Sequence, residues 1–67
     1  MVIMKFIEFQ TDDGMIAIDI NFIYCIREYS GDTTDIFILE YDQPKQINVH
    51  GNYNEVYKYI VNFHEVK

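Results

Sequence analysis

The sequence predicts a small α+β fold, in which an antiparallel meander of about five strands is followed by one C-terminal helix. Apolar and polar residues alternate with a period of two over much of residues 2–50, which is typical of strands. Clusters of Gly, Asp and Pro interrupt this alternation at short intervals, as turns do. From residue 53 onward the apolar spacing changes to three and four, which indicates a helix. A chain of 67 residues has room for a single domain, residues 1–67.

The first two strands are expected to form a hairpin. Val2 to Phe9 carries apolar residues on both faces, so this strand is expected to be covered on both sides. Asp13-Gly14 supplies the left-handed backbone that a tight turn needs. Met15 to Ile20 then alternates in a regular way. Its predicted inward residues are Ile16, Ile18 and Ile20, and its outward residues are Ala17 and Asp19.

The middle of the chain predicts a helical turn and two more strands. Asn21 to Tyr24 fits a single helical turn with Asp19 or Asn21 as its cap. A third strand is expected from about Cys25 to Tyr29, and a turn at Ser30 to Thr34 precedes a fourth strand, Asp35 to Tyr41. In that strand Ile36 and Ile38 face one side, and Phe37, Leu39 and Tyr41 face the other.

The last strand and the helix follow. Asp42 to Lys45 is a predicted turn built on Pro44, and Gln46 to His50 is a short fifth strand whose Ile47 and Val49 point one way. Asn52 and Glu55 have the spacing of a capping box, which predicts a helix start. The expected buried stripe of that helix is Val56, Ile60 and Phe63.

Charge and composition restrict the partners. Eleven acidic and five basic residues give a net charge of -6, which opposes direct binding to nucleic acid and to acidic membranes. No segment has the roughly 20 apolar residues that span a bilayer. The N-terminal run is interrupted by Lys5 and Glu8 and lacks a small-residue cleavage site. With Cys25 as the single cysteine, we expect a cytoplasmic protein, in a bacterium or in a phage-infected host cell.

The residues that could carry chemistry do not form a recognisable motif. Asp12-Asp13 lacks the further oxygen ligands of a calcium loop and is expected to be a solvated turn. Cys25 lies in an apolar run and is expected to be buried, while His50 and His64 are expected to be structural or exposed. The glycines are isolated in turns, and no nucleophile has a base at a known spacing. The sequence therefore predicts a protein that is not an enzyme and that binds neither a cofactor nor a metal.

An apolar surface is left over in this arrangement. One helix can cover only part of a five-stranded sheet, so Phe37, Leu39 and Tyr41 need closure of the sheet into a partial barrel or contact with another molecule. Tyr29 joins them as a candidate interface residue, because tyrosine is favoured at interfaces. A small core without a disulfide also favours a homo-oligomer.

The stretch from Asp13 to Ile60 resembles the FlbD/SwrD-like small flagellar accessory proteins. Asp13-Gly14 corresponds to the family's first hairpin, and Asp19 to Ile23 to its Asn-Pro-Asp-Leu-Ile segment. Ile26-Arg27-Glu28, Gly31-Asp32-Thr33 and Asn54-Glu55-Val56 correspond to its Ile-Glu, its Pro-Asp-Thr turn and its helix start. Gly31 replaces the family's turn proline, and residues 42–45 replace its second Asn-Gly. The resemblance implies a non-enzymatic accessory that acts through protein contact.

Two leading hypotheses for function follow, and an enzyme with an active site composed of residues from two subunits is the least favoured third. The first is a non-enzymatic, self-associating regulatory module that docks on a protein partner, for which the charge suits a basic surface. The alternative is a small phage or mobile-element inhibitor of a host defence system. Such an inhibitor would act by nucleic-acid mimicry, or by holding a small signalling nucleotide between subunits with Arg27, Lys45 and Lys58.

Overall fold

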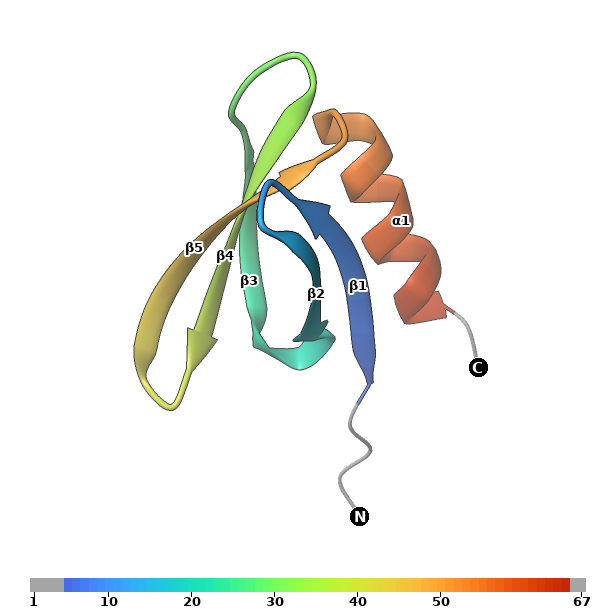
Figure 1. The fold of residues 1–67 in the computed structure, drawn as a ribbon. Helices are drawn as coiled ribbons and strands as arrows, with labels where there is room; N and C mark the ends of the chain where they lie inside the picture. Colours follow the sequence, from blue (N-terminus) through green and yellow to red (C-terminus); the bar gives the residue numbers. More distant parts are fainter. Residues whose placement is uncertain (1–4, 66–67) are drawn as a thin grey trace.

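The computed structural model describes residues 5–65, with side chains as far as Phe63. It confirms the predicted α+β class, five antiparallel strands followed by one helix (Figure 1). The elements are β1 (Phe6–Thr11), β2 (Gly14–Asp19), the 3-10 turn η1 (Ile20–Phe22), β3 (Ile23–Glu28), β4 (Thr33–Glu40), β5 (Gln43–His50) and α1 (Tyr53–Glu65).

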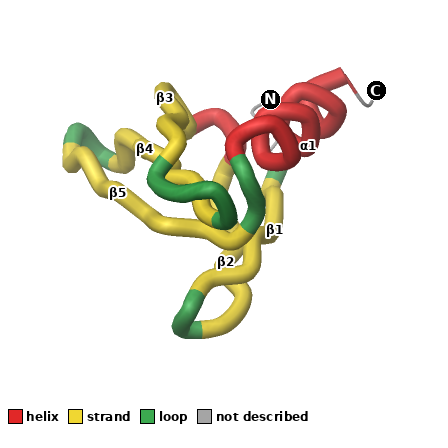
Figure 2. The backbone as a smooth tube through the Cα atoms, turned by 90° about the horizontal axis from the view of Figure 1, so that it is seen from above, coloured by secondary structure: helices red, strands yellow, loops and turns green. Residues whose placement is uncertain are grey.

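The strands form two sheets instead of one. β1 pairs with β2, while β3, β4 and β5 form a three-stranded sheet in chain order. Within residues 5–65 no ladder joins the two sheets, so the partial barrel does not form. β1 lies beside β5 without pairing with it, and Figure 2 shows the β1–β2 hairpin standing apart from the larger sheet.

The core lies where the two sheets and α1 meet. The faces predicted to carry the apolar residues of β2, β4, β5 and α1 do point to the core, although Ile16, Ile47, Ile60 and Phe63 are only half-buried. The buried hydrophobic residues are Ile7, Phe9, Ile18, Ile20, Ile36, Ile38, Val49 and Val56.

The first hairpin is covered on one face only. Ile7 and Phe9 are buried, but Phe6 on the opposite face of β1 is half-exposed, so the expected cover on both sides is wrong for this strand. The residues of the predicted strand from Val2 to Met4 lie outside the described part of the chain. Gly14 has φ 108°, which confirms the expected need for glycine at this turn.

Asp19 is buried, contrary to the outward position predicted for it. Its Oδ1 accepts a hydrogen bond from the backbone N–H of Asn21 at 2.9 Å and caps η1. Of the two caps considered, Asp19 is therefore the one used. The cap brings the carboxylate in against η1 because the chain turns there to bury Ile20.

Cys25 is exposed, and the prediction of a buried thiol is wrong. The pairing of β3 with β4 shifts register between Ile23 and Cys25, which indicates a bulge at Tyr24. One extra residue in a strand moves every later side chain to the opposite face. Cys25 therefore shares the face of its partner Phe37, on the side away from the core.

The β4–β5 turn lies earlier in the chain than predicted. Tyr41 and Asp42 form it, with φ 51° and 64°, so Tyr41 is not in the strand and the expected turn at residues 42–45 is wrong. Positive φ at both residues is typical of the two-residue hairpin turn that matches the twist of strands. Pro44 belongs to β5 opposite Leu39. In an antiparallel ladder, hydrogen-bonded and non-hydrogen-bonded pairs alternate, and Leu39–Pro44 is a non-hydrogen-bonded pair. The backbone nitrogen of Pro44, which has no hydrogen to donate, therefore lies at the free edge of β5.

α1 begins with the predicted capping box. The Asn52 N–H donates to Glu55 Oε1 at 3.1 Å, and the Glu55 N–H donates to Asn52 Oδ1 at 2.9 Å. Val56 is buried, and Ile60 and Phe63 pack against the core, which confirms the predicted stripe. In residues 5–65 no helix has the length and apolar character needed to cross a membrane.

Candidate functional site: two uncovered surfaces

The three-stranded sheet has one face that no other element covers within the described residues. We call it the outer face, since it points away from the core side that carries Ile36 and Ile38. The pairing register of β3, β4 and β5 places its side chains. They are Cys25, Arg27, Asp35, Phe37, Leu39, Pro44, Gln46 and Asn48.

One half of the outer face is polar and centres on Asp35. This carboxylate is only 2% exposed, although no layer lies over it, because side chains of the neighbouring strands surround it. Gln46 Nε2 and Asn48 Nδ2 each donate to it at 2.9 Å, and Arg27 Nη2 lies 3.8 Å from Oδ2. The polar half is therefore satisfied by its own hydrogen bonds and has no unpaired carboxylate oxygen to offer a cation.

The other half of the outer face is apolar. The Phe37 ring lies 5.2 Å from the Arg27 guanidinium carbon, which is over its face, and 6.4 Å from the Tyr24 ring. Leu39 is 46% exposed and pairs across the strands with Pro44, which is also exposed. Phe37, Leu39, Tyr24 and Pro44 thus form a small apolar surface, which we call the apolar patch.

The structure brings together two of the four predicted interface residues. Phe37 and Leu39 stand on the same face of β4, two residues apart. Tyr41 is 85% exposed in the β4–β5 turn, and its ring contacts Phe22 at 6.2 Å, on the other side of the sheet. Tyr29 follows β3 near the opposite end of β4, where its N–H donates to the Thr33 carbonyl. The strand between them spans roughly 26 Å, so Tyr29 and Tyr41 cannot act in one small contact.

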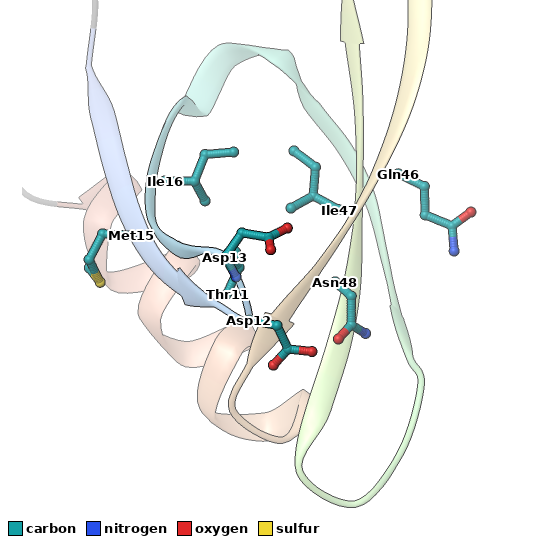
Figure 3. A pocket seen from close by; sticks show the side chains of 8 residues that line it. All are labelled: Thr11, Asp12, Asp13, Met15, Ile16, Gln46, Ile47 and Asn48. Carbon is teal, nitrogen blue, oxygen red and sulfur yellow. The ribbon is translucent and has the colours of Figure 1, made fainter.

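The second surface is a cleft between the two sheets. Two adjoining cavities form it, of about 470 and 430 Å³, and both are lined by Ile16 of β2 and Ile47 of β5. Figure 3 shows these two side chains pointing toward each other across the first cavity. Thr11, Asp12, Asp13 and Asn48 lie around one end of the cleft, and Phe6, Phe22, Ile38 and Tyr41 around the other.

The rim of the cleft is acidic. Asp12, Asp13, Asp19 and Glu40 line it, against the single basic residue Lys45. Lys45 Nζ already contacts Glu40 Oε1 at 3.0 Å, so its charge is paired within the protein. At the closed end, His50 Nε2 lies 2.7 Å from Asp12 Oδ1 and links the β1–β2 turn to the end of β5. Asp12 and Glu40 thus have partners and Asp19 is buried as the cap of η1, so Asp13 is the rim carboxylate without a side-chain partner among the described residues.

Sequence reasoning missed the cleft, because it treated all five strands as one sheet. The sequence placed Ile16 on the inward face of its strand and Ile47 on the same face as Val49, and it gave no signal that these two positions line a cleft. Their half-buried state shows that the sheets separate at this point. That separation depends on how two distant hairpins pack, which alternation alone does not encode.

No metal centre is formed by the described residues, since no three His, Cys, Asp or Glu side chains among them gather around one point.

Two exposed tyrosines of α1 contact each other, with the Tyr53 and Tyr57 rings stacked at 6.2 Å. Tyr59 packs edge-on against Phe9 of β1 at 5.4 Å and helps to hold the helix in place.

Comparison with family models, with curated proteins and with solved structures finds no match for this chain. The resemblance to flagellar accessory proteins therefore stays a prediction from the residues.

Proposed function

We propose that this protein is a non-enzymatic regulatory module of the cytoplasm that self-associates and acts by contact with other proteins. The observation that carries the proposal is the apolar patch, where exposed Leu39 and half-buried Phe37 stand on a sheet face that no other helix or strand of the described chain covers. An exposed apolar surface beside polar groups is typical of protein contact sites.

The apolar patch supports a weak self-association. Three strands of eight residues or fewer present a face of roughly 26 by 14 Å, so two such faces together would bury on the order of 750 Å². Stable interfaces bury about 1,200–2,000 Å², so contact through this face alone is expected to give a transient dimer. Within the neighbouring polar half, Asp35 would add little cost on burial, because it is already buried and its hydrogen bonds are made within one chain.

The alternative of a phage inhibitor is not favoured by a specific feature. Mimicry of nucleic acid requires exposed, unpaired carboxylates gathered on one surface. Of the four that line the cleft, Asp19 is buried as the cap of η1 and Glu40 contacts Lys45. Nucleotide binding requires free basic groups. Of the three residues considered for it, Arg27 faces Asp35 and Phe37, and Lys45 contacts Glu40. The third, Lys58, is exposed on α1 and does not line the cleft.

The test is a charge placed in the apolar patch. Leu39→Lys should abolish self-association, since two lysines would have to meet across the contact without partners. Met15→Lys is the control, because Met15 is also an exposed strand residue but lies in the other sheet. Sedimentation velocity over a range of protein concentrations measures the change. A wild-type protein that stays monomeric at high micromolar concentration would overturn the proposed self-association.

A further inference from the structure

We infer that the cleft between β2 and β5 binds an extended basic peptide segment of a partner protein, which pairs with the free edge of β2 as a third strand. The inference rests on the proposed role in protein contact and adds the site and the chemistry of the partner. It uses a surface different from the apolar patch on the outer face.

The free edge of β2 can pair with another strand. The hydrogen bond from the Ile20 N–H to the Lys5 carbonyl, 2.9 Å long, fixes which pairs of the β1–β2 ladder are hydrogen-bonded. Hydrogen-bonded and non-hydrogen-bonded pairs alternate along an antiparallel ladder, so Met15 and Ala17 belong to non-hydrogen-bonded pairs. Their N–H and C=O groups therefore point away from β1. Among residues 5–65, no other segment makes a backbone hydrogen bond to Met15 or Ala17.

The second cavity of the cleft runs along this edge. Its lining includes four consecutive residues, 16–19, so the strand borders it with its backbone edge and not only with one face. Across the cavity, β4 and β5 contribute Ile38 and Ile47 from the core face of their sheet. A strand placed along β2 would therefore form backbone hydrogen bonds on one side and pack alternate side chains against Ile38 and Ile47.

The charge of the cleft selects a basic segment. Asp12 and Asp13 lie exposed at one end, where Asp12 contacts His50 and Asp13 has no side-chain partner among the described residues. The only basic residue in the lining, Lys45, is paired with Glu40. Lysine or arginine residues that alternate with apolar residues in the entering strand would place cations beside these carboxylates. A second copy of this chain is a poor complement, because it carries a net charge of -6 itself.

The direct test uses a labelled peptide of about eight residues in which Lys and Val alternate, the pattern of an extended strand with one apolar face. Fluorescence anisotropy should show saturable binding to the whole protein. Two control peptides have the same length: one alternates Glu and Val, and the other has all its Lys before all its Val. Both should bind at least roughly tenfold more weakly, since one reverses the charge and the other lacks the alternation.

Hydrogen exchange locates the peptide. Addition of the Lys-Val peptide should slow exchange at the amides of Met15 and Ala17, which β1 leaves free. Ala17→Pro removes one of these N–H groups and should weaken binding roughly tenfold, because the proline ring also displaces the entering strand. Gln10→Pro is the matched control, since Gln10 occupies the equivalent position on the opposite edge of the hairpin and should bind as the wild type does.

A second pair of variants leaves the backbone unchanged and so guards against misfolding of the proline variants. Asp13→Lys changes the rim of the cleft, and Asp32→Lys makes the same change of charge in the exposed β3–β4 loop. Only Asp13→Lys should weaken peptide binding by roughly tenfold, because Asp13 lines the cleft and would lie beside the peptide, whereas Asp32 does not line it.

The inference is overturned by equal binding of the Lys-Val and Glu-Val peptides, by no binding, or by equal effects of the two aspartate variants. It is also overturned if hydrogen exchange at the Met15 and Ala17 amides slows without peptide as the protein concentration rises. A second copy of the protein would then occupy the free edge of β2. The oligomeric state, measured in the same samples by sedimentation, separates this outcome from failure of the proposed self-association.

Discussion

At the scale of single residues, Asp35 shows how a sheet face without a covering layer can still bury a carboxylate. The neighbouring strands supply the amide donors Gln46 and Asn48, both at 2.9 Å, while Arg27 lies farther away at 3.8 Å and is itself exposed. Exposed ion pairs contribute little, whereas hydrogen bonds to a buried charge contribute more. The two amides therefore account for most of the stabilisation of this carboxylate.

We expect Asn48→Ala to lower the free energy of unfolding by about 1.5–3 kcal/mol, because it removes a hydrogen bond to a buried charged group. Urea unfolding followed by circular dichroism measures this change. Gln43→Ala is the control on the same strand, since Gln43 is exposed, and a change within about 0.5 kcal/mol is expected. Equal effects of the two variants would contradict the role given to Asn48.

At the scale of elements, the connection between β5 and α1 positions the helix over the core. Gly51 has φ 117°, its N–H donates to the Asp32 carbonyl at 2.7 Å, and its carbonyl accepts from Thr34 Oγ1 at 2.9 Å. A Cβ at this position would lie 3.2 Å from Val56 Cγ2. The connection therefore requires glycine both for its backbone and for the close approach of the helix.

Gly51→Ala should destabilise the protein by about 1–3 kcal/mol, the range for a side chain forced into a disfavoured backbone region. Gly31→Ala is the matched control, because a Cβ there would meet open space. That variant is expected to be neutral or more stable by up to about 1 kcal/mol. Thermal unfolding of both proteins compares them, and a Gly51→Ala protein as stable as the wild type would refute this account.

At the scale of the whole molecule, two sheets share one small core and then separate. They meet around Ile7 and Val49 and are linked at one end by the contact between Asp12 and His50. The β4–β5 turn extends away from the first hairpin, which leaves the cleft open (Figure 1). Because residues of both sheets belong to one core cluster, the sheets should unfold together.

Ile36→Val tests this coupling. The loss of one buried methylene should cost about 0.5–1.5 kcal/mol and shift a single transition. Tyrosine fluorescence and far-ultraviolet circular dichroism should report the same midpoint, and Met15→Val, at an exposed strand position, should leave that midpoint nearly unchanged. Two separate transitions would show that the sheets do not depend on a common core.

Local sequence determined the elements whose cause spans only a few residues. The Asp13-Gly14 turn, the capped turn after β2, the Asn52 and Glu55 capping box and the inward sides of β2, β4 and β5 all follow from neighbours in the chain. Backbone preferences and capping hydrogen bonds act over one to four residues, so a single sequence displays them.

Tertiary structure alone decided the features that depend on distant pairing. The register shift near Tyr24 exposes Cys25, the turn at Tyr41 and Asp42 separates Tyr41 from Phe37 and Leu39, and the split into two sheets opens the cleft. The register shift turns Cys25 to the opposite face, the turn takes Tyr41 out of the strand, and the split leaves Ile16 and Ile47 half-buried. The physical reason is that a shift of one residue in a strand reverses its faces, and only the partner strand selects the register.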